Sequence, residues 1–377
     1  MSRAKGFLYA LECARCGWVG VCALEDLPRA SCPRCGGLPL IRYRGARFEI
    51  RRGERGVWRY SSLLPPLPVK VSLGEGLTPV TAVGEVLVKN ERLNPTGSYA
   101  DRASAVIASH AKSVGASQLC VEYVQDFTKS LAHYLHFSGL RVRVAAEDVL
   151  AIDGEDAFLL ASREVEVSAA CPETLRYPNP LTVEGLKTII FEMFEQGVKA
   201  ERVVVPASTG VLALSLLKGL ADLREVGLDA SYEVVAAALK GSKPPYLEGV
   251  AGVRVVEVPG VELFETYRRL VGKGFRVKPI VALSYHVAEN LGSSAAVATM
   301  GYRAPGRRKD SDVRRLVLEA LRRGEALTAY EIWRENPLFT LRAVYKAVRA
   351  MESRGEICGE VVARGRRKVK VYRLCSY

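Results

Sequence analysis

The sequence predicts an α/β protein in three parts: a small cysteine-rich module, a body with a mostly parallel sheet, and a C-terminal helix-turn-helix module with a hairpin. Three observations lead to this prediction. Two tight cysteine pairs open the chain, short apolar segments alternate with amphipathic ones through the middle, and a basic segment closes it. We place the parts at residues 1–45, 46–305 and 310–377.

Length and composition narrow the class of protein. The chain has 377 residues, of which 49% are hydrophobic and 25% charged, and this balance excludes a disordered or fibrous chain. No apolar run reaches the roughly 18 residues of a membrane span, and no signal-peptide core follows the first residues. We therefore expect a cytoplasmic protein without a membrane segment. Few Asn and Gln beside many Arg, Glu and Val are typical of a thermophile.

The first module carries two Cys-x-x-Cys-Gly knuckles separated by 15 residues. Two intervening residues let one turn direct both thiolates at one ion, and the glycine lets backbone amides approach the sulfurs. Four thiolates leave no open position, so we expect a structural zinc site, a zinc ribbon, with the ligands Cys13, Cys16, Cys32 and Cys35. The other cysteines, Cys22, Cys120, Cys171, Cys358 and Cys375, follow no spacing, and we expect no disulfides.

The middle of the chain alternates between two patterns. Short apolar segments predict strands at residues 86–88, 118–121, 142–144, 202–205 and 233–236. Amphipathic segments predict helices at residues 103–114, 129–137, 184–195, 212–223 and 263–271. Strand and helix in alternation predict a parallel sheet covered on both faces.

Several motifs in this region resemble the threonine synthases, which use pyridoxal phosphate (PLP) and have the tryptophan-synthase-β-like fold. The motifs are Ser72-Leu73-Gly74-Glu75-Gly76-Leu77-Thr78-Pro79, the segment from Val88 to Arg102, and Asn179-Pro180-Leu181-Thr182-Val183-Glu184-Gly185. The resemblance covers about residues 10–305. It implies the two-domain, parallel-sheet body of PLP fold-type-II enzymes.

The sequence does not contain the catalytic and cofactor-binding residues that the resemblance implies. Ala100 stands where the family has the Schiff-base lysine, and a methyl group can neither form an imine nor carry a proton. Bulky residues 122–127 replace the loop beneath the cofactor ring, and residues 207–212 hold one glycine where a glycine-rich phosphate loop is expected. We expect no catalytic residue and no bound PLP. Lys89 matches a family lysine, and we expect Lys112 and Lys129 on helix surfaces.

Small polar residues remain near the expected cleft. They are Thr96, Ser98, Ser208, Thr209 and Gly210. One interpretation is a site for an amino acid or a phosphorylated metabolite, and the other is a closed cleft that serves only as scaffold.

The last part of the chain is strongly basic. Residues 307–377 hold 18 Lys and Arg against 9 Asp and Glu, whereas the other 306 residues hold 36 against 32. After a polar linker at residues 306–311, helical spacing begins at Asp312, and Thr328 with Glu331 forms a capping box for a second helix. Residues 336–339 predict a turn, residues 340–353 a third helix, and residues 357–363 and 369–374 two strands.

This order predicts a winged helix and resembles small archaeal and bacterial transcription regulators. The third helix would enter the major groove and the hairpin tip would contact phosphates of double-stranded DNA. The candidate DNA-binding residues are Arg342, Tyr345, Lys346, Arg349, Arg364, Arg366, Arg367 and Lys368. A winged helix that binds only proteins is the alternative.

Together these features predict a non-catalytic threonine-synthase-like regulator that binds DNA, forms a homo-oligomer and senses an amino-acid metabolite. Two alternatives remain: a threonine synthase or related PLP-dependent lyase, and a non-catalytic partner subunit of an active paralogue.

Overall fold

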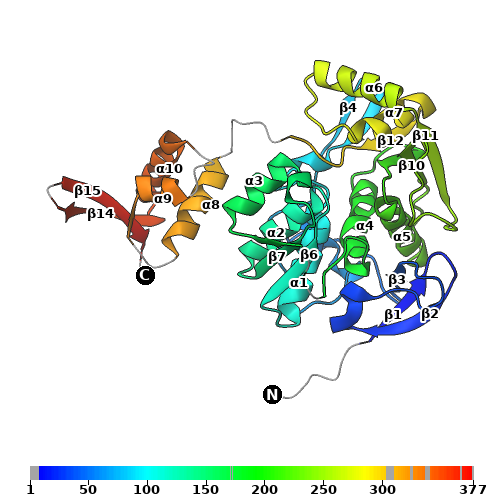
Figure 1. Cartoon of the computed structure of the whole chain (residues 1–377), viewed down its shortest axis with the longest axis horizontal. Helices are drawn as coiled ribbons and strands as arrows, with labels where there is room; N and C mark the ends of the chain where they lie inside the picture. Colours follow the sequence, from blue (N-terminus) through cyan, green and yellow to red (C-terminus); the bar gives the residue numbers. More distant parts are fainter. Residues whose placement is uncertain are drawn as a thin grey trace. The chain divides into compact units, whose positions relative to one another are not determined.

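The computed structural model describes residues 8–169, 171, 173–302, 310–322, 326–335, 340–365 and 367–375. The chain divides into two compact units, Met1–Arg303 and Ala304–Tyr377, which we describe separately (Figure 1). Most of the expected linker at 306–311 and the expected turn at 336–339 lie outside the described residues. Within the described part of the chain, no helix combines the length and the hydropathy that a membrane span requires.

An antiparallel three-stranded sheet, ordered β2-β1-β3, opens the first unit. Its strands are β1 (Leu8–Cys13), β2 (Val19–Ala23) and β3 (Pro39–Ile41). Tyr9, Leu11 and Ile41 on this sheet are buried in the same apolar core as the body. The ribbon therefore shares a core with the body instead of building one alone.

A six-stranded sheet, ordered β11-β10-β9-β12-β5-β4, forms the larger half of the body. All neighbours are parallel except β4 and β5. Along β9, Val203 and Val205 join the core that holds α4 and α5, whereas Val204 joins the core that holds α6 and α7. The sheet is thus covered on both faces. Its elements are β4 (Val80–Val83), β5 (Val86–Lys89), α4 (Pro180–Glu195), β9 (Arg202–Pro206), α5 (Val211–Glu225), β10 (Glu233–Leu239), β11 (Val253–Val258), α6 (Gly260–Gly272), α7 (Val281–Leu291) and β12 (Ser294–Val297).

A second, parallel sheet of three strands, ordered β6-β7-β8, forms the smaller half. Its elements are α1 (Asp101–Ser113), β6 (Gln118–Glu122), α2 (Phe127–Phe137), β7 (Arg141–Ala145), α3 (Gly154–Ser162) and β8 (Glu166–Ser168). Four short 3-10 helices complete the unit: η1 (Leu24–Arg29), η2 (Gly56–Leu63), η3 (Glu91–Leu93) and η4 (Val149–Ala151).

The expected strands and helices of the body are confirmed with boundaries that differ by a few residues. The patterns in the sequence predicted none of β4, α3, β8 and β11, nor the pair α7 and β12. The last two are almost wholly buried, so their residues lack the polar–apolar contrast that periodicity needs.

The second unit has the element order helix, strand, helix, helix, hairpin. Its elements are α8 (Asp310–Leu321), β13 (Leu327–Thr328), α9 (Ala329–Glu335), α10 (Leu341–Ser353), β14 (Ile357–Arg364) and β15 (Arg367–Leu374), with the sheet order β13-β15-β14. The capping box is confirmed, because Glu331 N donates to Thr328 Oγ1 at 3.1 Å and Thr328 N donates to Glu331 Oε2 at 2.7 Å. Both hairpin strands are longer than expected, and Arg364 pairs with Arg367 across them.

The expectation of no disulfides is wrong. Cys120 is bonded to Cys171, and Cys358 to Cys375, with Cα atoms 6.3 Å and 5.2 Å apart. Both distances lie within the range that a disulfide spans. The first two cysteines are 51 residues apart in sequence and meet only through tertiary structure, so their spacing carries no signal, whereas the second two, 17 residues apart, lie across the open end of the β14–β15 hairpin.

Candidate functional site

The four knuckle cysteines gather at one point of the ribbon. Their sulfur atoms all lie within 4.8 Å of one another. Gly17 and Gly36, with φ of +68° and +67°, donate to the carbonyls of Cys13 and Cys32 and close the two turns. Four convergent thiols are the donor set of a closed tetrahedral metal site, so this cluster could hold a metal ion.

The segment around Ala100 satisfies its own polar groups. Ala100 is fully buried at the N-terminus of α1, and its amide donates to Ser98 Oγ at 3.1 Å. The Thr96 hydroxyl donates to Asp101, and the Thr96 amide donates to the same carboxylate at 2.6 Å. The hydroxyls of Thr96 and Ser98, two of the expected ligand contacts, are therefore engaged within the segment itself.

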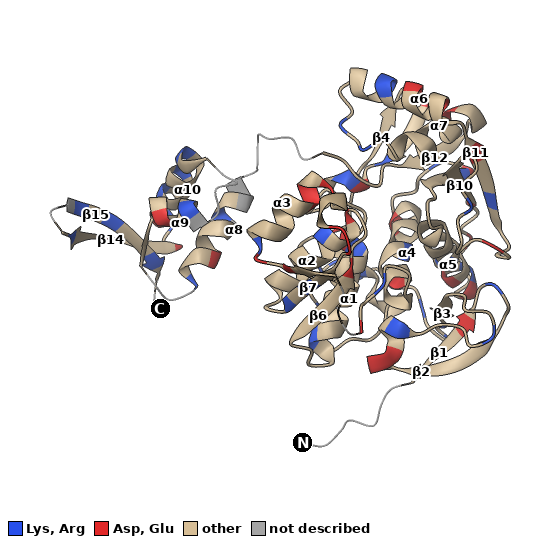
Figure 2. Cartoon of the chain, in the orientation of Figure 1, with Lys and Arg blue, Asp and Glu red and all other residues tan. Residues whose placement is uncertain are grey.

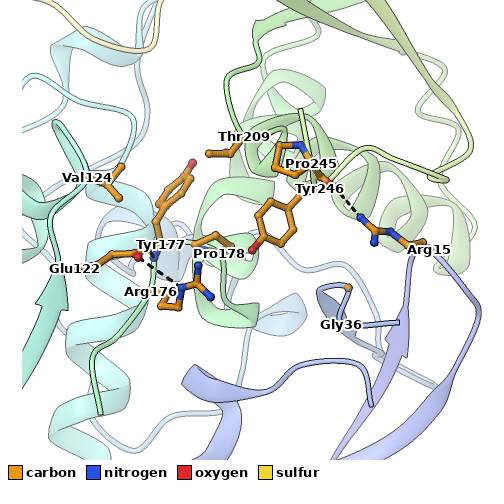
Figure 3. Close-up of a pocket in the computed structure, with 11 residues that line it drawn as sticks. Arg15, Gly36, Glu122, Val124, Arg176, Tyr177, Pro178, Thr209, Pro245 and Tyr246 are labelled. Carbon is orange, nitrogen blue, oxygen red and sulfur yellow. Dashed lines mark hydrogen bonds and ion pairs between the residues drawn. The ribbon is translucent and has the colours of Figure 1, made fainter. Parts of the chain in front are cut away.

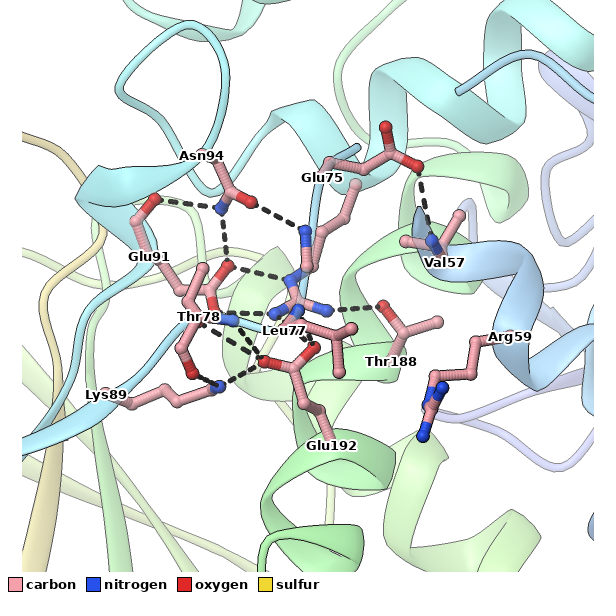
Figure 4. Close-up of polar contacts among 12 residues, drawn as sticks. Val57, Arg59, Glu75, Leu77, Thr78, Lys89, Glu91, Asn94, Thr188 and Glu192 are labelled. Carbon is pink, nitrogen blue, oxygen red and sulfur yellow. Dashed lines mark hydrogen bonds and ion pairs between the residues drawn. The ribbon is translucent and has the colours of Figure 1, made fainter. Parts of the chain in front are cut away.

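Buried charges hold the segment that follows (Figure 4). Arg102 donates twice to Glu91, at 2.7 Å each, and lies 3.0 Å from Glu192, which also accepts from Lys89. Burial alone would raise the pKa of Glu91, but Arg102 and Lys89 outweigh burial and hold it at about 2. Burial lowers the pKa of Lys89, although Glu192 and Glu91 act in the opposite direction, and its Nζ donates to Glu192 and to the Thr78 carbonyl at 2.5 Å. Lys89 is thus a structural part of this buried network.

A second buried charge cluster lies where β6 leads into α2, and it corrects the surface position expected for Lys129. Lys129 is 2% exposed, and its Nζ lies 2.6 Å from Asp126 Oδ1 and 3.2 Å from Asp156 Oδ1. Lys278, just before α7, reaches the same group and lies 3.0 Å from Asp126 Oδ2. Burial lowers the pKa of both lysines, but Asp126 and its neighbours outweigh it and leave each pKa raised. Both lysines therefore stay protonated. Lys112 is exposed, as expected.

A cavity of about 500 Å³ opens between the ribbon and the two halves of the body (Figure 3). Its walls come from five places: the knuckles, the end of β6, the segment before α4, the N-terminal end of α5, and the loop after β10. The lining residues are Arg15, Gly36, Gly37, Glu122, Val124, Arg176, Tyr177, Pro178, Thr209, Pro245 and Tyr246. A volume of this size suits a small molecule, and the carboxyl ends of parallel strands are where such sites form in α/β proteins.

Of the expected ligand residues, only Thr209 lines this cavity. Ser208 is exposed. Gly210 caps α5 with a φ of +91°, but a Cβ built on it would lie 2.5 Å from Leu247 Cγ, so a side chain covers the backbone expected to face a phosphate. Ala100 does not line the cavity, although Tyr99 Oη lies 2.7 Å from Tyr177 Oη.

No pattern in the sequence predicted Arg15, Arg176 or Tyr246 as pocket residues. Arg15 lies inside a knuckle, and the other two lie in loops without a motif. No periodicity or spacing marks them, because the tertiary fold alone brings them together.

These observations test whether PLP fits the body. The position implied for the imine lysine holds a methyl group, and the buried Lys89, Lys129 and Lys278 are all ion-paired. The backbone at Gly210 is covered. The buried Lys187 and Lys218 are likewise paired, both with Asp222.

The second unit carries the expected basic helix. Val344, Val348 and Met351 of α10 are buried, while the side chains on the opposite face, Arg342, Tyr345, Lys346 and Arg349, are exposed. Figure 2 shows Lys and Arg along both α10 and the hairpin.

The hairpin residues are less uniform. Arg364 donates to Glu331 at 2.5 Å, which ties the hairpin to the first turn of α9, and Lys368 is exposed. Arg366 and the side chain of Arg367 lie outside the described part of the chain.

Comparison with known proteins shows modest similarity to threonine synthases. The chain is 30% identical over 251 residues to the threonine synthase of Methanocaldococcus jannaschii, covering 56% of this chain and 61% of that one. It is 26% identical over 271 residues to that of Methanosarcina acetivorans, covering 63% and 66%. The matches thus span less than two thirds of these relatives' length. No family model matches the chain.

Among solved structures, maize serine racemase has a TM-score of 0.50 at 13% identity, covering 66% of this chain and 93% of that one. A pyridoxal 5'-phosphate-dependent aspartate racemase has a TM-score of 0.47 at 11% identity, covering 58% and 84%. The first likeness shows that the body shares the parallel-sheet α/β fold of maize serine racemase.

Proposed function

We propose that the chain is a non-catalytic relative of the threonine synthases that regulates transcription by binding double-stranded DNA through α10, with zinc as a structural ion in the ribbon. The body provides a ligand pocket, not an active site. The observation that carries the proposal is the cationic face of α10, in a chain where Ala100 stands at the position expected for the Schiff-base lysine.

The absence of catalysis rests on the charges in the body. A Schiff-base lysine must lose its proton to attack an aldehyde. The carboxylates beside Lys129 and Lys278 favour the protonated forms of both, and Lys89 is paired with Glu192. No lysine among these three is suited to replace the one missing at Ala100.

DNA binding rests on the second unit, whose element order is that of a winged helix. In that fold the helix before the hairpin enters the major groove. The exposed Arg342, Lys346 and Arg349 recur every three or four residues and so share one face of α10, opposite the buried stripe. Exposed cations in this arrangement suit both phosphates and guanine edges.

The test is a fluorescence titration of mixed-sequence duplex DNA with the full chain at about 50 mM and about 200 mM salt. We expect the triple variant Arg342→Gln, Lys346→Gln, Arg349→Gln to bind more weakly and with a salt slope shallower by about 2 to 3. The control Lys240→Gln, Lys243→Gln, Arg254→Gln removes three exposed charges from the body, giving the same net charge, and should bind like the parent. Equal binding by both variants, or no binding by the parent at low salt, contradicts the proposal.

The similarity to threonine synthases favours a second candidate, a PLP-dependent lyase with an altered site. It requires a lysine adduct with PLP, and borohydride reduction followed by peptide mass spectrometry decides between the two candidates.

A further inference from the structure

The pocket combines positive charge with a rigid wall. Arg15 and Arg176 line it together with a single acid, Glu122. Glu122 is already engaged, since its Oε1 accepts from Tyr177 N at 2.6 Å and its Oε2 lies 3.5 Å from Arg176 Nε. The Arg176 side chain is 70% exposed, so most of its donors face solvent at the mouth of the cavity.

Arg15, unlike the exposed Arg176, is held in place by hydrogen bonds. Its Nε donates to the Glu248 carbonyl at 3.0 Å and one Nη to the Pro245 carbonyl at 2.6 Å. These bonds fasten the knuckle to the loop that carries Tyr246, whose ring lines the cavity (Figure 3). Arg15 also lies 3.8 Å from Glu248 Oε2, and because the Glu248 side chain is 81% exposed, water screens this ion pair and the guanidinium still contributes positive charge to the pocket.

The start of α5 borders the pocket but is already covered. Thr209 lines the cavity one residue before Gly210, the N-cap of α5, and its hydroxyl accepts from Val211 N at 3.4 Å, while Leu247 covers the backbone at Gly210. The two arginines are therefore the features that favour an anion, and the volume of about 500 Å³ suits a molecule of metabolite size.

The wall of the pocket that holds Arg15 also belongs to the cysteine cluster. Arg15 lies between the ligands Cys13 and Cys16, and Gly37, which lines the pocket, has Cys13 Sγ and Cys35 Sγ 3.2 Å from the position of a Cβ. The positions of the four cysteines therefore determine the position of this wall of the pocket.

We propose that this pocket binds a small metabolite bearing a phosphate or carboxylate group, held by Arg176 and Arg15, and that its occupancy is coupled to metal retention by the ribbon. The inference rests on the proposed function in treating the body as a ligand site. Coupling is reciprocal in binding free energy: a ligand held by the knuckle wall strengthens metal binding, and metal loss weakens ligand binding by the same factor.

The binding test is calorimetry of the metal-loaded full chain with O-phospho-L-serine, inorganic phosphate and L-aspartate as separate probes. We expect at least one probe to bind, and Arg176→Gln to weaken it by about tenfold through loss of a charge-assisted contact. Arg143→Gln is the matched control, because Arg143 is also an exposed arginine paired with one glutamate, Glu166, outside the pocket. If O-phospho-L-serine and inorganic phosphate bind and L-aspartate does not, phosphate is the recognised group. If L-aspartate binds, carboxylate is recognised. No binding by any probe, or equal binding by both variants, overturns the proposal.

The coupling test follows zinc release to a chromogenic chelator with and without the probe that binds. We expect the probe to slow release in the parent and in Arg143→Gln but not in Arg176→Gln. Unchanged release in the parent overturns the coupling. No DNA is present in either test, and the triple α10 variant should bind the probe like the parent, so failure of DNA binding and failure of this inference are distinguishable.

Discussion

The ammonium of Lys278 lies 3.0 Å from Oδ2 of Asp126, and this contact joins the two halves of the body. Lys278 precedes α7 beside the large sheet, whereas Asp126 caps α2 beside the small one. Both side chains are almost fully buried. The ion pair therefore links the two halves of the body.

Loss of this ion pair should destabilise the first unit. Lys278→Met leaves Asp126 with only Lys129 as a partner, so we expect the free energy of unfolding to fall by about 3 kcal/mol. Urea denaturation measures the loss. Lys273→Met removes an exposed lysine nearby and should change the free energy by less than about 0.5 kcal/mol. Equal stability of the two variants would show that the pair contributes little.

Chemical trapping decides whether the body uses PLP. We expect the chain, incubated with PLP and reduced with borohydride, to carry no specific adduct on Lys89, Lys129 or Lys278, because each is buried and ion-paired. Peptide mass spectrometry locates any adduct, with scattered labelling of exposed lysines such as Lys112 as the internal control. A stoichiometric adduct on one buried lysine would favour the enzyme over the regulator.

The sequence predicted what depends on local pattern. The cysteine knuckles, the alternating strands and helices and the capping box of Thr328 all depend on residues close together in the chain, and the structure has each of them. The burial of Lys129 could not be predicted in this way, because a lysine at the start of an amphipathic helix has the pattern of a surface residue. Its partners Glu155 and Asp156 come from a distant segment.

The pocket shows the same limit. Thr209 was predicted from a motif, but Arg15 and Arg176 are 161 positions apart in the numbering of the chain. They meet only because the ribbon packs on the body. Thr96 and Ser98 were expected to contact a ligand in the cleft, but the neighbouring Asp101 and the Ala100 amide engage their hydroxyls, and no local pattern in the sequence marks these contacts.

The buried carboxyl of Glu75 should make stability depend on pH. Burial raises its pKa from 4.5 to about 7, although it accepts from Tyr134 Oη at 2.9 Å and Leu73 N at 3.0 Å. Since the folded state holds this proton more tightly than the unfolded state, the contribution is fully present below pH 4.5 and is lost as the pH rises through 7. The total change amounts to about 3 kcal/mol.

Urea midpoints from pH 4.5 to 7.5, compared between the parent and Glu75→Gln, isolate this group, because a glutamine does not titrate in that range. The difference in unfolding free energy between the two should change with pH in the stated direction. Glu257→Gln, at an exposed acid, should leave the pH profile of the parent unaltered. Parallel profiles for the parent and Glu75→Gln would mean that Glu75 keeps its ordinary pKa.

The Cys120–Cys171 disulfide should stabilise the small half of the body. It closes a loop of 51 residues that contains α2, β7, α3 and β8, and the chain-entropy model assigns such a loop about 4 kcal/mol. Urea unfolding of Trp333→Phe, in which fluorescence reports on Trp18 and Trp58 of the first unit, should show this loss on adding a reductant. The same protein with Cys120→Ser and Cys171→Ser should not respond, whereas Cys358→Ser with Cys375→Ser should respond fully.

The same bond should also affect the pocket. Leu175 N donates to Cys120 O at 2.7 Å and Glu122 N to Leu175 O at 3.0 Å, so the chain at Leu175 and Arg176 runs along β6 as far as the cavity. Reduction removes the covalent link between Cys171 and β6, and we expect the probe that binds the pocket to bind more weakly to the reduced chain. Equal probe affinity in both redox states would show that the hydrogen bonds to β6 alone position Arg176.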